Sequence, residues 1–168
     1  MSDQSVKHLL HYTKETYDGS FSTDLLEQYK LYVQSADNVS VRRVSSNRYL
    51  LTVNAALVAS YGFQSASSGL TIWTVPVAVA GIIISLLMWS LIKSHRDLNA
   101  VKFKVIHELE KHLPAALYGY EWQLAQEGRG KIYRSVSQIE LWIPVVFLAL
   151  HVTALVPLML CMIPGISY

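Results

Sequence analysis

Charged residues are missing from three long stretches of this 168-residue chain, at residues 49–70, 70–92 and 141–163. The 14 Lys and Arg residues and the 12 Asp and Glu residues crowd into the segments outside these stretches. Since 52% of the residues are apolar, more than a soluble domain of this size normally carries, the excess must be buried somewhere. This separation of charged segments from long uncharged apolar segments indicates an integral membrane protein.

Cysteine is almost absent as well. The only one, Cys161, lies inside the last apolar stretch, where it is interpreted as an apolar filler. A single cysteine excludes an intramolecular disulfide, a CxxC redox pair and a cysteine metal site. The first 48 residues are polar and mixed in charge, so they lack the basic segment, short apolar run and cleavage site of a signal peptide, and we expect none to be removed.

Catalytic motifs are missing too. His107-Glu108 resembles the start of a metalloprotease helix, but HExxH requires a histidine where this chain has Lys111. The glycine-rich turn at residues 128–131 lacks the spacing of a phosphate-binding loop, and no GxSxG elbow occurs. We therefore expect no enzyme, no cofactor and no metal site; a lipid-modifying enzyme would have to be built from His95, His107 and Glu108.

The charge-free stretches predict three transmembrane helices. Residues 70–92 and 139–163 each supply the roughly 20 apolar residues that a hydrocarbon core of about 30 Å requires. Residues 49–69, which include an outer turn, are more polar and are assigned as a span because helical periodicity runs into them from Asp24 without a break.

Basic residues predict the orientation of these spans. Six of the 14 lie before the first span and eight lie between the second and third, with none in the outer turn or after the third span. Basic residues are retained on the cytoplasmic side of membranes. We therefore place residues 1–23 and the loop at 93–138 in the cytoplasm and the tail at 164–168 outside.

The cytoplasmic part is expected to be helical. Residues 24–48 predict an amphipathic helix that runs into the membrane, and the 93–138 loop predicts one helix near 94–113 and a shorter one near 117–125. The fold class is therefore an all-α membrane protein. Such a small set of helices rarely buries enough apolar surface alone, so the apolar faces of these helices must pack on each other or on a neighbouring subunit. We expect a ring-like homo-oligomer.

The spans contain small residues four positions apart, which allow helix backbones to approach closely. This spacing favours helix–helix contacts within or between subunits. The pairs are Ala55 with Ala59, Ala56 with Ser60, Gly81 with Ser85, and Ala149 with Thr153.

Several short blocks between Leu25 and Pro144 carry a resemblance to a known family. They are Tyr29-Lys30-Leu31-Tyr32, Ser40-x-Arg42-Arg43, Asn47, Asn54-x-Ala56-Leu57, Asp97-Leu98-Asn99, the run from Lys102 to Glu108, Leu113-Pro114, Glu121-Trp122, and Ile139-Glu140-x-Trp142-Ile143-Pro144. In their order and spacing the chain resembles the RipA-like bacterial inner-membrane proteins, which are octameric. The resemblance implies a bacterial inner-membrane homo-oligomer of eight subunits with no established catalytic activity.

One group of candidate site residues lies where the first helix meets the headgroups. Its side chains could bind lipid phosphate, pair with loop acids such as Glu110, or cap neighbouring helices. The candidate interface or intersubunit contacts are Arg42, Arg43, Asn47, Arg48, Glu108 and Glu121.

A second group consists of polar residues inside the spans, where each needs a hydrogen-bonding partner or a wet cavity. These candidates are Thr52, Asn54, Ser60 and His151. They could line a central pathway, with Gln64 at its outer end. Alternatively, His151 stays neutral and bonds a backbone carbonyl or Asn54 of a neighbouring helix.

These features together predict a non-enzymatic inner-membrane homo-oligomer that acts as a cytoplasm-facing scaffold or interaction platform. The alternative is an oligomeric channel or pore with a gated or lipid-filled central space, and a lipid-modifying enzyme is a third reading. The expected partners are other copies of the chain, membrane lipids and unidentified proteins. The net charge of +2 is too small to indicate nucleic acid.

Overall fold

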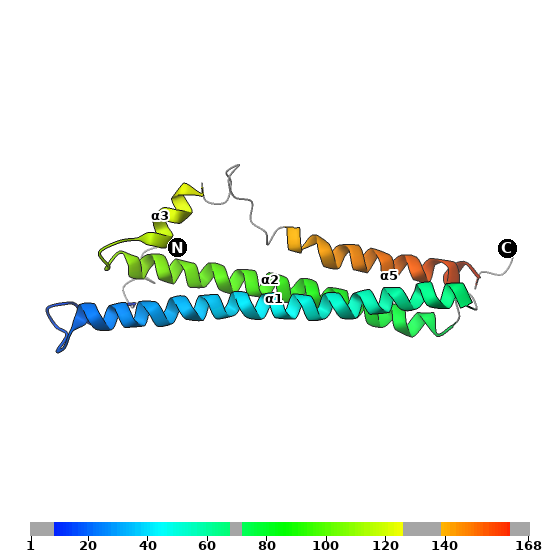
Figure 1. Ribbon diagram of the computed structural model, residues 1–168, viewed down its shortest axis with the longest axis horizontal. Helices are drawn as coiled ribbons and strands as arrows, with labels where there is room; N and C mark the ends of the chain where they lie inside the picture. Colours follow the sequence, from blue (N-terminus) through cyan, green and yellow to red (C-terminus); the bar gives the residue numbers. More distant parts are fainter. Residues whose placement is uncertain (1–8, 68–71, 126–138, 162–168) are drawn as a thin grey trace. The chain divides into compact units, whose positions relative to one another are not determined.

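The computed structural model describes residues 9–67, 72–125 and 139–161, which form helices and connecting turns without a strand in these ranges (Figure 1). The helices are α1 (Phe21–Ser67), α2 (Thr74–Glu110), α3 (Leu117–Leu124) and α5 (Trp142–Cys161). The expected all-helical fold is confirmed for these residues. The 128–131 turn and the 164–168 tail lie outside the described residues.

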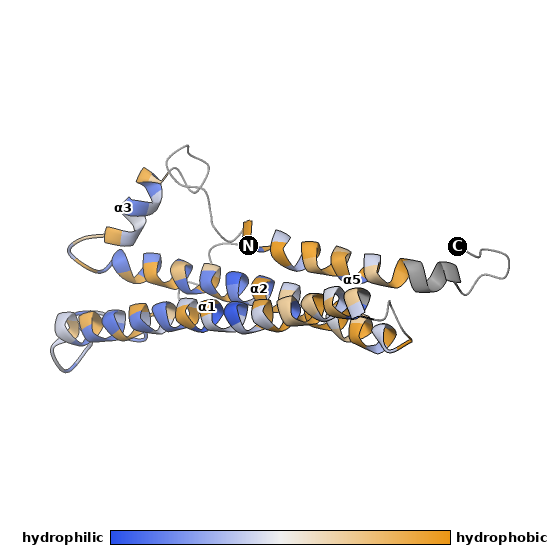
Figure 2. Ribbon diagram, turned by 45° about the vertical axis from the view of Figure 1, so that its right-hand side comes forward, coloured by the Kyte–Doolittle hydropathy of each residue, from blue (hydrophilic) through white to orange (hydrophobic). Residues whose placement is uncertain are grey.

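The chain divides into two compact units. The polar unit combines residues 1–40 with 97–134, and the apolar unit combines residues 41–96 with 135–168. Figure 2 shows the difference in hydropathy, with blue residues frequent at the start of α1 and orange residues dominant in α5. Within the apolar unit, residues 49–67, 72–92 and 141–156 contain no Asp, Glu, Lys or Arg.

The first helix starts one turn earlier than the expected residue 24. The Asp24 N–H donates to the carbonyl oxygen of Ser20 at 3.0 Å, which closes the first turn. The Asp24 carboxylate lies in that turn, where a negative charge is stabilised by the helix dipole, and it accepts the hydroxyl of Tyr17 at 2.8 Å. From Phe21 the helix continues without a break to Ser67. The continuity past residue 48 follows the predicted periodicity, but the helix also extends into the residues expected to form the outer turn.

The second helix crosses the expected boundary at residue 93. A separate helix was expected to start near Ser94, but α2 is continuous from Thr74 to Glu110 because the chain has neither proline nor glycine between Gly81 and Pro114. The helix therefore passes from the apolar unit into the polar unit. It ends three residues before the expected residue 113.

The polar unit is held together by packing between α1 and α2, which run side by side (Figure 1). Its core consists of apolar residues from both helices, namely Leu25, Ala36, Ile106 and Leu109. Around this core Lys102 donates to the Ser35 hydroxyl at 2.8 Å and lies over the Tyr32 ring. This packing covers only part of the apolar surface of the two helices, because Leu26, Leu98 and Val101 remain exposed.

The apolar unit packs α5 and the first part of α2 against the end of α1. Met88 and Ile92 are fully buried there, whereas many other large apolar side chains, such as Ile83 and Val146, are exposed. Among the described helices, α2 alone is long and apolar enough to cross a membrane by length and composition, and residues 142–156 form a shorter apolar helix.

Candidate functional site

The apolar unit contains a buried hydrogen-bond network that joins its three helices. His151 of α5 lies within 3.0 Å of the Asn54 side-chain oxygen on α1 through Nε2, and within 2.8 Å of the Tyr61 hydroxyl through Nδ1. Ser85 of α2 donates to the same Asn54 oxygen at 3.0 Å. Asn54 and His151 are fully buried, so this network replaces the water that their polar groups would otherwise bind.

The hydrogen-bond partners determine the proton positions in the network. The Asn54 amide nitrogen donates to the carbonyl of Leu50 at 3.0 Å, so the amide oxygen faces Ser85 and His151. That oxygen can only accept, and therefore Nε2 of His151 carries a hydrogen. Nδ1 then accepts from the Tyr61 hydroxyl. A neutral imidazole thus satisfies both of its nitrogens.

Gly81 provides the space that the imidazole occupies. A Cβ atom at this position would overlap the ring of His151. One turn further along α2, Ser85 also reaches the Gly81 carbonyl at 2.8 Å, so its single hydroxyl hydrogen is shared between two acceptors. The Gly81–Ser85 pair therefore serves a contact within one subunit, where α2 receives a side chain of α5.

The network is stabilised by ring packing as well as by hydrogen bonds. Tyr61 and His151 pack edge to face, with ring centroids 5.7 Å apart and an interplanar angle of 87°. A buried polar group left without a hydrogen bond costs about 1–3 kcal/mol, so a helix arrangement that separates these groups is disfavoured. Nearer the end of α1, Thr74 donates to the Gln64 side-chain oxygen at 2.9 Å.

The four polar candidates within the predicted spans fall into two groups in the structure. It brings Asn54 and His151 together, as one of the two expected arrangements required. Thr52 is exposed and donates to the Arg48 carbonyl at 2.9 Å, and Ser60 donates to the Leu57 carbonyl at 2.6 Å. These two hydroxyls are bonded within their own helix, which leaves them outside the network.

Sequence reasoning did not identify Tyr61 as a partner of His151. The signal that could have found it is its position seven residues after Asn54, which places both side chains on the same face of a helix. An aromatic hydroxyl at this spacing was compatible with a membrane-interface position as well. Its role became visible only when α5 was placed against α1.

A second buried polar centre lies in the polar unit, at the carboxylate of Glu110. This last residue of α2 is 2% exposed and accepts the backbone N–H groups of Tyr118 at 2.8 Å and Gly119 at 2.9 Å. The residue before α3, Ala116, has no side-chain cap to offer. Glu110 therefore supplies the cap from another helix, and its negative charge also suits the positive end of the α3 dipole.

The hydroxyl of Tyr29 on α1 completes this centre by donating to Glu110 at 3.0 Å. Burial, together with this hydrogen bond to a carboxylate, raises the pKa of Tyr29 to about 12. Burial also raises the pKa of Tyr118. Tyr29 thus keeps its proton at any physiological pH, and one carboxylate ties α1, α2 and α3 to each other.

The candidate arginines at the start of the apolar unit have different environments. Nε of Arg43 lies 3.8 Å from a carboxylate oxygen of Glu140, and both side chains are mostly buried. Arg42 and Arg48 are exposed. The Asn47 side-chain oxygen is buried and has no hydrogen-bond partner among the described residues.

The acids proposed as arginine partners are used elsewhere within the subunit. Glu108 pairs at 2.7 Å with Lys111, the residue that follows the end of α2, and Glu110 caps α3. Glu121 is exposed. The acid that Arg43 meets, Glu140, had been noted only as part of a family block. In the part of the chain that the structure describes, no group of three or more His, Cys, Asp or Glu residues could hold a metal ion.

Comparisons with known proteins identify one family. The model of the octameric membrane protein family (8xMP) matches residues 26–160. A search of curated proteins finds no match, and neither does a search of solved structures. The matched range contains the Asn54–His151 network, the Glu110 centre and all four helices apart from the first turns of α1 and the last residue of α5.

Proposed function

Since the chain belongs to the octameric membrane protein family, we propose that eight copies form a non-enzymatic scaffold in the bacterial inner membrane. In this proposal the apolar units lie in the bilayer and the polar units face the cytoplasm as an interaction platform. The resemblance to the RipA-like proteins supports this placement, and so does the position of the basic residues, which lie before residue 49 or between residues 93 and 134.

We propose three spans in each subunit: the end of α1, the first part of α2, and α5. Their described parts carry no formal charge, and the polar side chains at their centre are hydrogen-bonded to one another. This pairing supports a location in hydrocarbon, where such groups have no water to bind. Exposed side chains such as Ile83, Leu86 and Val146 then face lipid rather than water.

The observation that carries the scaffold proposal is the internal pairing of Asn54 with His151. A channel or transporter needs polar groups that water or an ion can reach. Both residues are fully buried inside one subunit and are hydrogen-bonded to each other. His151 also bonds Tyr61, and Asn54 also bonds Ser85. The strongest intramembrane polar residues of the sequence therefore fix the helices in place.

The channel alternative depends on Thr52, the exposed member of the polar candidates on α1. Its hydroxyl still has a free acceptor site after it donates to Arg48, so a ring of Thr52 side chains could contact water at an oligomer axis. One hydroxyl ring among apolar neighbours is a weaker basis for a pathway than a buried histidine and amide would have been.

A flux measurement in vesicles distinguishes the two functions. We expect proteoliposomes that contain the purified octamer to leak K⁺ and a small anionic dye no faster than empty vesicles, with gramicidin as the positive control for K⁺. Flux that requires the protein and falls in Thr52→Val would support a pore and contradict the scaffold proposal. The particle mass, measured on the same sample, shows whether eight subunits are present.

A further inference from the structure

The Lys and Arg residues of the apolar unit outnumber its acids. The single acid is Glu140, whose carboxylate lies 3.8 Å from Arg43. The other basic residues of the unit are exposed and have no ion pair among the described residues; they are Arg42 and Arg48 on α1 and Lys93 and Arg96 on α2. These four exposed cations therefore form a basic surface that no described carboxylate neutralises.

The cations of α1 and α2 lie at one level of the apolar unit. The two helices follow each other in the chain and lie side by side, so they run in opposite directions (Figure 1). Asn54 of α1 bonds Ser85 of α2. Eleven residues before Asn54 is Arg43, and eleven residues after Ser85 is Arg96, so these two cations are level with each other. The other three lie within two turns of this level.

The start of α5 lies at the same level. Glu140, two residues before this helix, is beside Arg43, and His151 is beside Asn54. Eleven residues separate the members of each pair along both segments, so α5 runs parallel to α1 in a fixed register.

The distance from this level to the buried network fits half of a bilayer. Eleven helical residues span about 16 Å, and a hydrocarbon core is about 30 Å thick. With the network at the middle of the core, the four exposed cations lie at the headgroups. Tyr49, Trp89 and Trp142, which are exposed within two turns of the same level, are residue types that collect at membrane interfaces.

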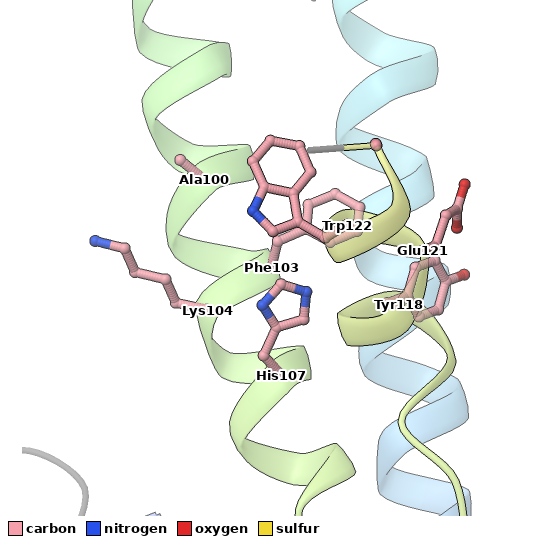
Figure 3. A pocket seen from close by; sticks show the side chains of 8 residues that line it. Ala100, Phe103, Lys104, His107, Tyr118, Glu121 and Trp122 are labelled. Carbon is pink, nitrogen blue, oxygen red and sulfur yellow. The ribbon is translucent and has the colours of Figure 1, made fainter. Parts of the chain in front are cut away.

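The lysines of the polar unit have acids near them. Lys30 and Lys111 each form an ion pair with a glutamate three residues earlier in the chain. In the groove between α2 and α3, Lys104 extends from one wall and Glu121 extends from the other (Figure 3). Charges of both signs are therefore mixed in the polar unit, whereas the exposed charges at the level of Arg96 are all positive.

We infer that the four exposed cations of the apolar unit bind the phosphate groups of anionic phospholipids. This inference rests on the proposed placement of the apolar unit in the bilayer, and it names the class of lipid that the protein selects. Arginine can hold a phosphate through two parallel N–H groups, and lysine acts as a point charge. Arg43 is not part of the surface, because Glu140 faces it.

A lipid suits this surface better than a soluble anion does. The Lys93 amine lies 5.6 Å from the centre of the Trp89 ring, which is itself 44% exposed. A phospholipid places its phosphate beside such an amine and its acyl chains over the apolar residues below. In phosphatidylcholine the choline balances the charge of the phosphate, so an excess of cations favours lipids that carry a net negative charge.

The composition of the retained lipid tests the inference. The protein is reconstituted in nanodiscs with equal amounts of phosphatidylglycerol and phosphatidylcholine and extracted again in mild detergent, and mass spectrometry counts both lipids. We expect phosphatidylglycerol to exceed phosphatidylcholine at least about threefold. The ratio should fall to about one when the four exposed cations are replaced together, as Arg42→Gln, Arg48→Gln, Lys93→Gln and Arg96→Gln.

The matched control removes the same number of charges from the polar unit. It combines exposed lysines, namely Lys14→Gln, Lys30→Gln, Lys104→Gln and Lys111→Gln, and should keep the ratio of the unmodified protein. An equal fall in both quadruple variants would assign the preference to total charge and overturn the inference. If the first variant does not assemble as the unmodified protein does, the single variants Arg48→Gln and Lys93→Gln decide, since each should lower the ratio.

The particle mass of the unmodified protein separates this inference from the proposed assembly. An octamer that retains the two lipids equally overturns the inference and leaves the assembly intact. Because the four cations belong to one subunit, a monomer that still enriches phosphatidylglycerol contradicts the assembly and supports the inference. A monomer without enrichment overturns both.

Discussion

His151 and Asn54 share a hydrogen bond of 3.0 Å although 97 residues separate them in the sequence. The bond joins α5 to α1, and Ser85 extends it to α2. Since each partner is fully buried, the loss of one leaves the other unsatisfied in an apolar environment. The same contact explains why α5, which has no charged residue among its described side chains, takes one position against the other helices.

Replacing Asn54 with Leu is expected to destabilise the protein by about 1–3 kcal/mol, because the hydrogen on His151 Nε2 and the Ser85 hydroxyl lose their shared acceptor. Unfolding by a denaturing detergent, followed by circular dichroism, measures the change. Thr52→Val is the control, since the Thr52 hydroxyl is exposed and bonds only its own helix. Equal stability of the two variants would show that the network contributes nothing.

Gly81→Ala is expected to destabilise the apolar unit by about 1–3 kcal/mol, because the added Cβ overlaps the His151 ring and α2 must move away from α5. Gly62→Ala is the matched control: Gly62 lies in the interior of α1 and has nothing within 4 Å of an added Cβ. There alanine should be neutral or stabilising, because it favours the helix.

A second substitution tests the cause of the Gly81→Ala effect. If the clash with the imidazole is responsible, His151→Ala should cost less in the Gly81→Ala protein than in the unmodified one. The two changes would then couple in a double-mutant cycle. Strictly additive effects would contradict the assigned contact.

Glu110→Gln is expected to weaken the cap on α3 by about 1 kcal/mol, because the charged acceptor for two backbone N–H groups is lost. Hydrogen exchange should become faster at the amides of Tyr118 and Gly119. Glu108→Gln is the control, since this carboxylate pairs with Lys111 rather than with the backbone of α3. Unchanged exchange at Tyr118 and Gly119 in Glu110→Gln would contradict the capping role.

Tyr29 should titrate later than an ordinary tyrosine. Its pKa is raised from 10.0 to about 12, so the folded protein holds this proton more tightly than the unfolded chain does. The resulting stabilisation is fully present below about pH 10 and is lost as the pH rises towards 12. An ultraviolet titration of the phenolates should therefore lose one late-titrating group in Tyr29→Phe. If the lost group titrates near pH 10, the buried contact with Glu110 is contradicted.

Much of the fold could be predicted from local patterns in the sequence. The lack of charge at residues 49–92 marked the apolar segments, and the periodicity after Asp24 predicted one helix that runs through residue 48. The lack of Pro and Gly after Gly81 could have predicted the continuous α2, but the change from apolar to charged residues was read as a boundary. Hydropathy reports the surroundings of a helix, not its end.

The candidate site was predictable only in part. A buried histidine and a buried amide each need a partner, which led to the Asn54–His151 bond as one of two solutions. Tyr61 and the Glu110 cap depend on which helix faces which, and this is decided by packing between distant segments. The groove that Phe103 of α2 and Trp122 of α3 line likewise depends on the turn after Glu110, which brings the two helices together.

The most direct test of the proposed scaffold is a cryo-electron microscopy map of the protein in lipid nanodiscs. The account predicts eight subunits, Asn54 bonded to His151 inside each one, and a central axis that is apolar and filled with lipid or closed. A continuous water-filled path lined by Thr52, or by Asn54 and His151 turned towards the axis, would contradict the scaffold and support a channel. A monomer would contradict the assembly itself.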